Sequence, residues 1–106
     1  MRLVWSNISK QEMLELRAYS LKIWGRDVAV KYMSDIRDCA KLIARGPHVG
    51  RRLKGDFRII RVRSHYLIFK INEATKTAVL ARVIHVTMDI ERHLPSQNAD
   101  FKGPNF

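Results

Sequence analysis

The second half of the chain shows a pattern of apolar and polar positions that predicts three consecutive strands. Residues 57–63 mix β-branched residues with arginines, and residues 77–85 alternate small and branched side chains. Residues 66–71, YLIFKI, are almost wholly apolar. Short polar breaks at 64–65 and 72–76 separate the three runs. Runs of this length joined by such breaks are typical of hairpins, so the sequence predicts an antiparallel meander. The apolar run is expected to be its central strand.

The first half of the chain predicts a short strand and a helix. Residues 2–5 are branched enough for an opening strand at a sheet edge. Ser9 followed by Glu12 fits a capping box at the start of a helix, with Asn7 as the alternative N-cap. The helix is expected to run to about residue 24, because the glycine that follows tolerates the left-handed conformation at a helix C-terminus.

A second helix is expected to start at Asp27, a good N-cap, and to end at Gly46-Pro47. Its apolar positions recur at spacings of three and four and predict one buried face, formed by Val28, Tyr32, Ile36, Cys39, Ala40 and Ile43. Only two or three residues separate the two helices, so they should form an antiparallel hairpin. The predicted fold is α+β, in the order β-α-α-β-β-β, with the helical hairpin packed on a small, mainly antiparallel sheet.

Composition limits the kinds of partner. The chain of 106 residues is expected to be one domain over 1–94, followed by a C-terminal tail over 95–106. Its net charge of +10 indicates a polyanionic partner: nucleic acid, a nucleoprotein machine or a small acidic protein. No run approaches the roughly 18 apolar residues of a membrane span. A membrane surface is not the expected partner either, because no single helix is both strongly amphipathic and uniformly basic. A single cysteine favours the reducing cytoplasm.

An ordered set of short motifs over residues 2–94 resembles the ParE/RelE superfamily of bacterial toxins, the ParE branch most closely. The motifs are the Tyr32 helix ending at Gly46-Pro47, then Gly50-Arg51-Arg52, SHYLIF at 64–69, RVIH at 82–85, Met88-Asp89-Ile90 and His93-Leu94. The resemblance implies the toxin half of a toxin–antitoxin pair, neutralised by a cognate acidic antitoxin and bound to operator DNA only together with it. ParE-like members poison DNA gyrase, whereas RelE-like members cut mRNA on the ribosome.

Basic residues and the C-terminal motif are the candidates for binding the target. Arginines are concentrated between residues 45 and 63, where an electropositive rim could meet phosphates or carboxylates. Arg58 should face away from Arg61 and Arg63, because side chains alternate along a strand. The target-binding candidates are Arg51, Arg52, Arg58, Arg61, Arg63, His85, Met88 and Asp89.

Large apolar side chains are the candidates for binding the antitoxin. An antitoxin segment could lie as a helix in an apolar groove or add a strand to the sheet edge. The antitoxin-binding candidates are Trp5, Met13, Trp24 and Met33. Each could equally be an ordinary core residue.

The residues that the ribonuclease members use are missing. Those relatives carry an arginine in the YLIF-like strand and a tyrosine or histidine near the C-terminus, where this chain has Leu67 and Leu94. His85 and His93 could substitute only in part, because a nuclease also needs a cation for the phosphate. No metal site or cofactor is expected. The sequence therefore predicts a non-enzymatic gyrase inhibitor; the alternatives are a RelE-like endonuclease, or an inactive member, since His85-Val86-Thr87 replaces the commoner His-Gly-Arg.

Overall fold

The computed structural model describes residues 1–46 and 49–94. The elements are β1 (Arg2–Trp5), α1 (Asn7–Trp24), α2 (Arg26–Arg45), β2 (Arg51–Arg52), β3 (Phe57–Val62), β4 (His65–Asn72), β5 (Thr77–His85) and α3 (Ile90–His93). The predicted order is confirmed, and two short elements are added to it. The predicted tail, 95–106, lies outside the described residues.

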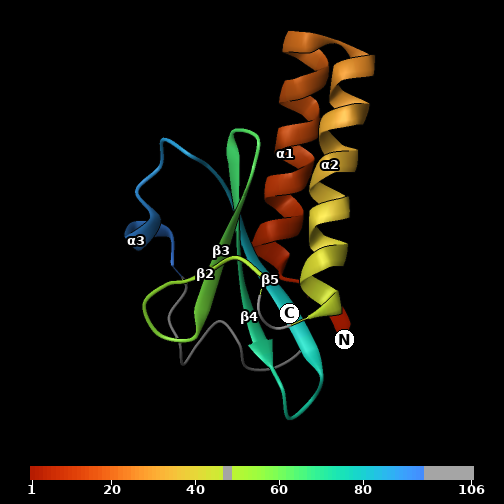
Figure 1. Cartoon of the computed structure of the whole chain (residues 1–106). Coiled ribbons are helices and arrows are strands. Elements are labelled where there is room, and N and C mark those ends of the chain that lie inside the picture. The colour runs from red at the N-terminus through yellow and green to blue at the C-terminus, as the bar shows by residue number, and fades with distance from the viewer. Residues whose placement is uncertain (47–48, 95–106) are drawn as a thin grey trace.

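The described strands form one sheet in the order β1-β5-β4-β3-β2. Strand β1 lies parallel to β5, and the other neighbours are antiparallel. Helices α1 and α2 cover one face of the sheet, and α3 lies on the other (Figure 1). The predicted α+β class, the meander and the edge position of the opening strand are therefore confirmed.

Each face of the sheet carries its own apolar core. Under the helical hairpin, α2 residues such as Ile36 and Ile43 pack on Leu67, Phe69 and Leu80. On the α3 side, a smaller cluster contains Phe57, Ile59, Ile68, Ala81 and Ile84, with Ile90 and Leu94 packed against it. The continuous apolar character of β4 follows from this, because its side chains enter a core on both faces.

The N-cap of α1 is Ser6 and not Ser9 or Asn7, the two residues predicted. Its Oγ accepts a hydrogen bond from the Ser9 backbone N–H at 3.0 Å, and the Ser9 hydroxyl donates to the Ser6 carbonyl at 2.9 Å. The Ser6 hydroxyl also donates to the Ala81 carbonyl at 2.7 Å. The predicted capping box of Ser9 and Glu12 is therefore wrong, because the cap must sit where α1 leaves the sheet. Asn7 is the first residue of the helix.

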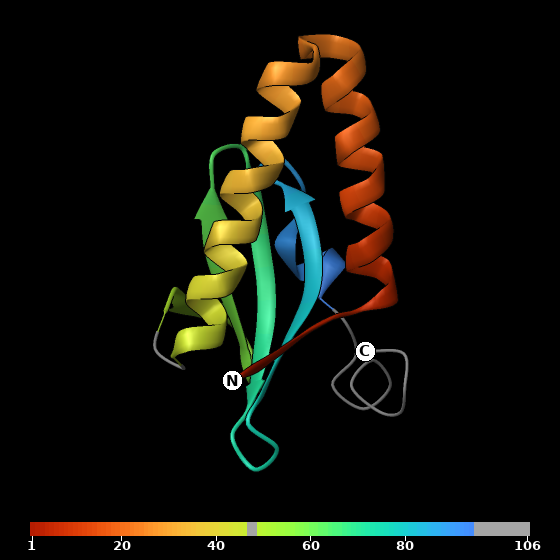
Figure 2. The same ribbon diagram turned by 90° about the vertical axis from the view of Figure 1, so that its right-hand side faces the viewer.

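The two helices meet at a single residue, Gly25, which caps both of them. Its φ of +85° favours glycine, and its N–H donates to the Leu21 carbonyl at 3.2 Å. The predicted linker of two or three residues and the Asp27 N-cap are wrong, because this glycine makes the whole reversal. The tip of the hairpin extends beyond the end of the sheet (Figure 2). Val28, expected in the buried face, is consequently 43% exposed.

Side chains close the part of the β5 edge that β1 leaves open. Strand β1 pairs with β5 only from Thr77 to Leu80. Beyond it, the Glu12 carboxylate accepts the Val83 N–H at 2.8 Å and the Arg82 guanidinium at 2.8 Å. Arg82 also donates to the His93 carbonyl at 3.0 Å. Glu12 and its partner Arg82 thus join α1, β5 and α3, and the Glu12 carboxylate satisfies an edge N–H that would otherwise have no acceptor there.

Candidate functional site

The helical hairpin carries an apolar groove with a basic rim, which we call the outer groove. Its first part, about 540 Å³, is lined by Leu3, Trp5, Lys10, Met13, Leu14, Arg17, Met33, Arg37, Ala40 and Lys41. An adjoining hollow of about 630 Å³ is lined by Arg17, Leu21, Arg26, Ala29, Val30, Met33 and Arg37. The two parts share Arg17, Met33 and Arg37, so they form one continuous surface along the hairpin.

The charges of the outer groove have one sign. Its cationic lining residues are Lys10, Arg17, Arg26, Arg37 and Lys41, and no carboxylate occurs among the described residues that line it. Leu14 and Val30, on the two helices, are 60% and 59% exposed. An apolar floor with cations along its rim fits an amphipathic segment that carries acidic residues.

The outer groove brings together three of the four residues predicted for antitoxin binding. Trp5, Met13 and Met33 all line it. Met33 is 4% exposed and belongs to the core, so it contributes only to the floor. Trp24 lies elsewhere, in a second groove on the opposite flank of α1.

This second groove, which we call the aromatic groove, has a volume of about 440 Å³. It is lined by Glu12, Glu15, Leu16, Tyr19, Trp24, Ser64, His65, Val83, His85 and Met88. Ring contacts continue from one side chain to the next, from Tyr19 to Trp24, Tyr32, His65 and His85, at centroid distances of 5.2–5.9 Å. The groove therefore has a nearly continuous aromatic wall.

Hydrogen bonds fix the tautomers of the two histidines in this wall. The Tyr32 hydroxyl accepts the Ser64 N–H at 3.1 Å, so it donates its own proton to His65 Nδ1 at 2.6 Å. His85 Nδ1 accepts the Thr87 N–H at 3.2 Å. In the neutral form, each ring therefore carries its proton on Nε2. Burial, and secondarily the nearby His85, lower the pKa of His65 from 6.5 to about 4.

The depressed pKa of His65 predicts a pH dependence of stability. Between pH 6.5 and about 4, His65 is protonated in the unfolded chain but stays neutral in the folded one. The contribution of His65 to the free energy of unfolding is therefore fully present above pH 6.5 and is lost as the pH falls towards 4. We expect His65→Gln to reduce the loss of unfolding free energy between pH 7 and 4.5 by about 1–2 kcal/mol, discounting for partial exposure. Urea unfolding at both pH values, with His93→Gln as the control, measures this. Equal losses in wild type and His65→Gln would contradict it.

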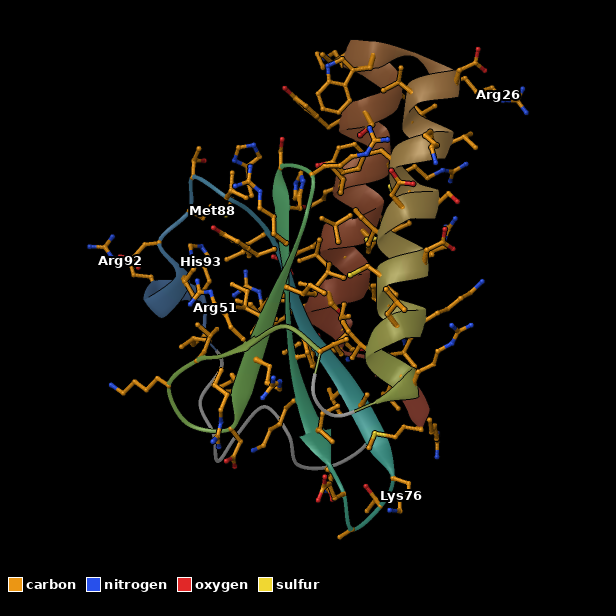
Figure 3. All side chains as sticks on the ribbon, viewed as in Figure 1. Arg26, Arg51, Lys76, Met88, Arg92 and His93 are labelled. Carbon is orange, nitrogen blue, oxygen red and sulfur yellow. The ribbon has the colours of Figure 1, made fainter. Side chains whose placement is uncertain are left out.

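The predicted basic rim does not form one patch. Arg51 and Arg52 are exposed on β2 and point to opposite faces of the sheet, because they pair with Ile59 and Arg58. Figure 3 shows Arg51, Arg92 and His93 on the side of the sheet away from the hairpin. Arg52 projects towards the hairpin side.

The other three arginines of the predicted rim make intramolecular hydrogen bonds. Arg58 donates to the Val49 and Gly50 carbonyls at 2.9 and 3.0 Å, so it braces the connection to β2. Arg63 bonds to Asp35 at 2.7 Å, and Arg61 donates to the Arg63 carbonyl at 2.7 Å. The prediction that Arg61 and Arg63 share a strand face is wrong, because β3 ends at Val62 and Arg63 turns with a φ of +53°.

The C-terminal candidates divide between two places. His85 and Met88 line the aromatic groove, and Met88 is 46% exposed. Asp89 does not line it; its carboxylate lies 3.8 Å from Arg92, and its carbonyl lies 2.7 Å from His93 Nδ1. Tyr19, Glu15 and His65, which also line the aromatic groove, were not among the predicted site residues. The helical spacing of Tyr19 and Glu15 places them on one flank of α1 and could have indicated that these two share a surface.

The two positions that ribonuclease relatives use are apolar and packed. Leu67 is fully buried under the hairpin, and Leu94 packs on the smaller core. In residues 1–46 and 49–94, no group of three or more histidine, cysteine or acidic residues could hold a metal ion. None of the helices in the described part of the chain is long and apolar enough to cross a membrane.

Comparisons with known proteins bear on the fold and on the family. The comparison with curated sequences finds no match. Among solved structures, the chain is similar to one described as the chromosomal ParDE TA system from P. aeruginosa, with 17% identity, a TM-score of 0.66, and 81% of this chain and 96% of that chain covered. It is also similar to a YoeB/ParE toxin from Agrobacterium tumefaciens, with 16% identity, a TM-score of 0.58, and 80% and 98% covered. These likenesses show the fold.

The family is shown by the sequence itself. Residues 3–90 match the family described as ParE toxin of type II toxin-antitoxin system, parDE, and the chain therefore belongs to the ParE toxin family.

Proposed function

We propose that this ParE-family chain is a cytoplasmic toxin that arrests growth by binding DNA gyrase, and that a cognate acidic antitoxin silences it. The observation that carries the antitoxin part is the outer groove, with an apolar floor and five cations along its rim. An antitoxin helix with an apolar stripe and flanking carboxylates would bury the exposed Leu14 and Val30 and neutralise the rim. Trp5, Met13 and Met33 would be contacts of that helix.

Action by binding is supported by the side chains at the nuclease positions. A ribonuclease needs a cation to stabilise the charged phosphorane and an acid or base to move protons. Leu67 and Leu94 can do neither; Leu67 is buried in a core, and Leu94 packs against the smaller one. A toxin that traps its target in one state needs only a surface that binds that state more tightly than the others.

The endonuclease alternative has one observation in its favour. His65 and His85 lie 5.2 Å apart between ring centroids, in the aromatic groove. Among the described residues that line this groove there is no lysine or arginine, and Glu12 and Glu15 contribute carboxylates. A phosphate would therefore meet negative charge, so we place the gyrase function first.

Expression in bacteria without the antitoxin separates these functions. Gyrase inhibition predicts blocked replication and DNA-damage signalling, with translation initially intact. Prompt loss of translation with cut messages would indicate the endonuclease. Normal growth would indicate a member that binds only its antitoxin.

A further inference from the structure

We propose that the aromatic groove is the surface with which the toxin holds its protein target. Its occupant is a polypeptide segment that inserts an apolar side chain and places an arginine or lysine beside Glu15. The proposal rests on the proposed function insofar as it requires a toxin that acts by binding.

The exposed side chains of the groove are those of a protein interface. Tyr19 and Trp24 are 55% and 45% exposed, and Met88 is 46% exposed on the facing loop. Trp24 is held rigidly, stacked on Tyr32 at 5.9 Å and touching Tyr19 edge-to-face at 5.8 Å. Aromatic residues and methionine are enriched at interfaces, and ordered aromatic rings lose little entropy when they bind. These side chains form a preorganised wall for an apolar anchor.

The polar groups of the groove indicate what accompanies that anchor. With their Nδ1 atoms in hydrogen bonds inside the protein, His65 and His85 each present an N–H donor at Nε2, which suits backbone carbonyls of a bound segment. The Glu12 carboxylate is occupied by Arg82, whereas Glu15 is an exposed carboxylate bonded to Gln11 at 3.2 Å. Glu15 can therefore accept a cationic side chain from the partner.

The charge of the groove argues for a protein and against nucleic acid. The chain has 20 lysines and arginines, yet in the described structure none of them lines this groove. The outer groove, on the other flank of α1, carries five cations. The different charges of the two flanks indicate two different partners. The acidic antitoxin suits one flank, and a basic segment suits the other.

Two substitutions test the proposal with the full-length chain. Glu15→Lys reverses the charge at an exposed site, and Met88→Asp removes an exposed apolar contact. Their matched controls are Glu73→Lys, in the turn between β4 and β5, and Ile8→Asp, which is 49% exposed outside both grooves. Inhibition of gyrase supercoiling, growth arrest on expression and affinity for the purified antitoxin are measured for each.

We expect Glu15→Lys and Met88→Asp each to weaken gyrase inhibition and growth arrest by about tenfold or more, with antitoxin affinity within about threefold of wild type. The controls should match wild type in all three. If Glu15→Lys strengthened the activity, the occupant would be nucleic acid, and the proposal would be overturned. Full activity in both variants would also overturn it, while leaving the gyrase function intact.

Different results would overturn the proposed gyrase function and the proposed role of the aromatic groove. If the wild-type chain arrests growth without inhibiting gyrase, the gyrase function is wrong, and the groove is still tested by growth arrest in the variants. If the wild-type chain neither arrests growth nor inhibits gyrase, both proposals are overturned.

Discussion

The double variant Leu14→Asp/Arg37→Glu will bind the cognate antitoxin about 100-fold more weakly than the wild-type chain. Leu14 is 60% exposed in the outer groove, and Arg37 lines both parts of it. Removing an apolar contact and placing two negative charges against an acidic segment should cost the roughly 2–3 kcal/mol typical of interface hot spots. Titration calorimetry with purified antitoxin measures the change, and toxicity should persist in cells that also express the antitoxin.

The matched control for this prediction is Ile8→Asp/Lys22→Glu. It makes the same kinds of substitution at exposed α1 positions that line neither groove. We expect its antitoxin affinity to stay within about threefold of wild type, because surface substitutions away from an interface have small effects. Equal losses of affinity in both double variants would contradict the assignment of the outer groove to the antitoxin.

Glu12→Ala will lower the free energy of unfolding by about 3 kcal/mol. The side chains of Glu12 and Arg82 are only 16% and 19% exposed. Without the carboxylate, the partly buried Arg82 loses its counter-charge and the Val83 N–H loses its acceptor, and breaking such a pair costs several kcal/mol. Chemical denaturation of purified protein measures the loss.

Two variants on the same helix make this prediction specific. Glu12→Gln keeps an acceptor for the Val83 N–H but removes the charge, so it should lose about half as much stability. Glu15→Ala removes an exposed carboxylate and should change stability by no more than about 0.5 kcal/mol. If Glu12→Ala were no more destabilising than Glu15→Ala, Glu12 would not join the three elements as described.

The elements were predictable from local patterns because each pattern had a strong physical cause. The apolar run of β4 indicated a strand with a core on both faces, and the periodicity of α2 indicated its buried side. What local patterns could not show is where the sheet ends. Val28 and Trp24 continue the helical stripes, but they lie at a hairpin tip that the sheet does not reach, so they are 43% and 45% exposed.

Some features of the fold depend on contacts that no local pattern shows. Glu12 has the spacing of a capping box with Ser9, but its carboxylate is needed 71 residues away, at the Val83 N–H. Arg58 donates to the carbonyls of Val49 and Gly50, a role for its guanidinium that charge along the sequence did not indicate. His65 joins Trp24 and Met88 in one groove only because the β3–β4 turn, the hairpin and the segment after β5 meet in space. No spacing along the chain shows that meeting.

A plasmid supercoiling assay tests most directly the proposal that this ParE-family chain acts by binding gyrase. Purified chain is added to purified gyrase, relaxed plasmid and ATP, and supercoiled and linear products are scored with and without antitoxin. We expect loss of supercoiling or accumulation of linear DNA at toxin concentrations comparable to gyrase. Antitoxin should reverse this effect of the wild-type chain, whereas the same amount of antitoxin should not reverse inhibition by Leu14→Asp/Arg37→Glu. Unchanged supercoiling at a large toxin excess would contradict the account.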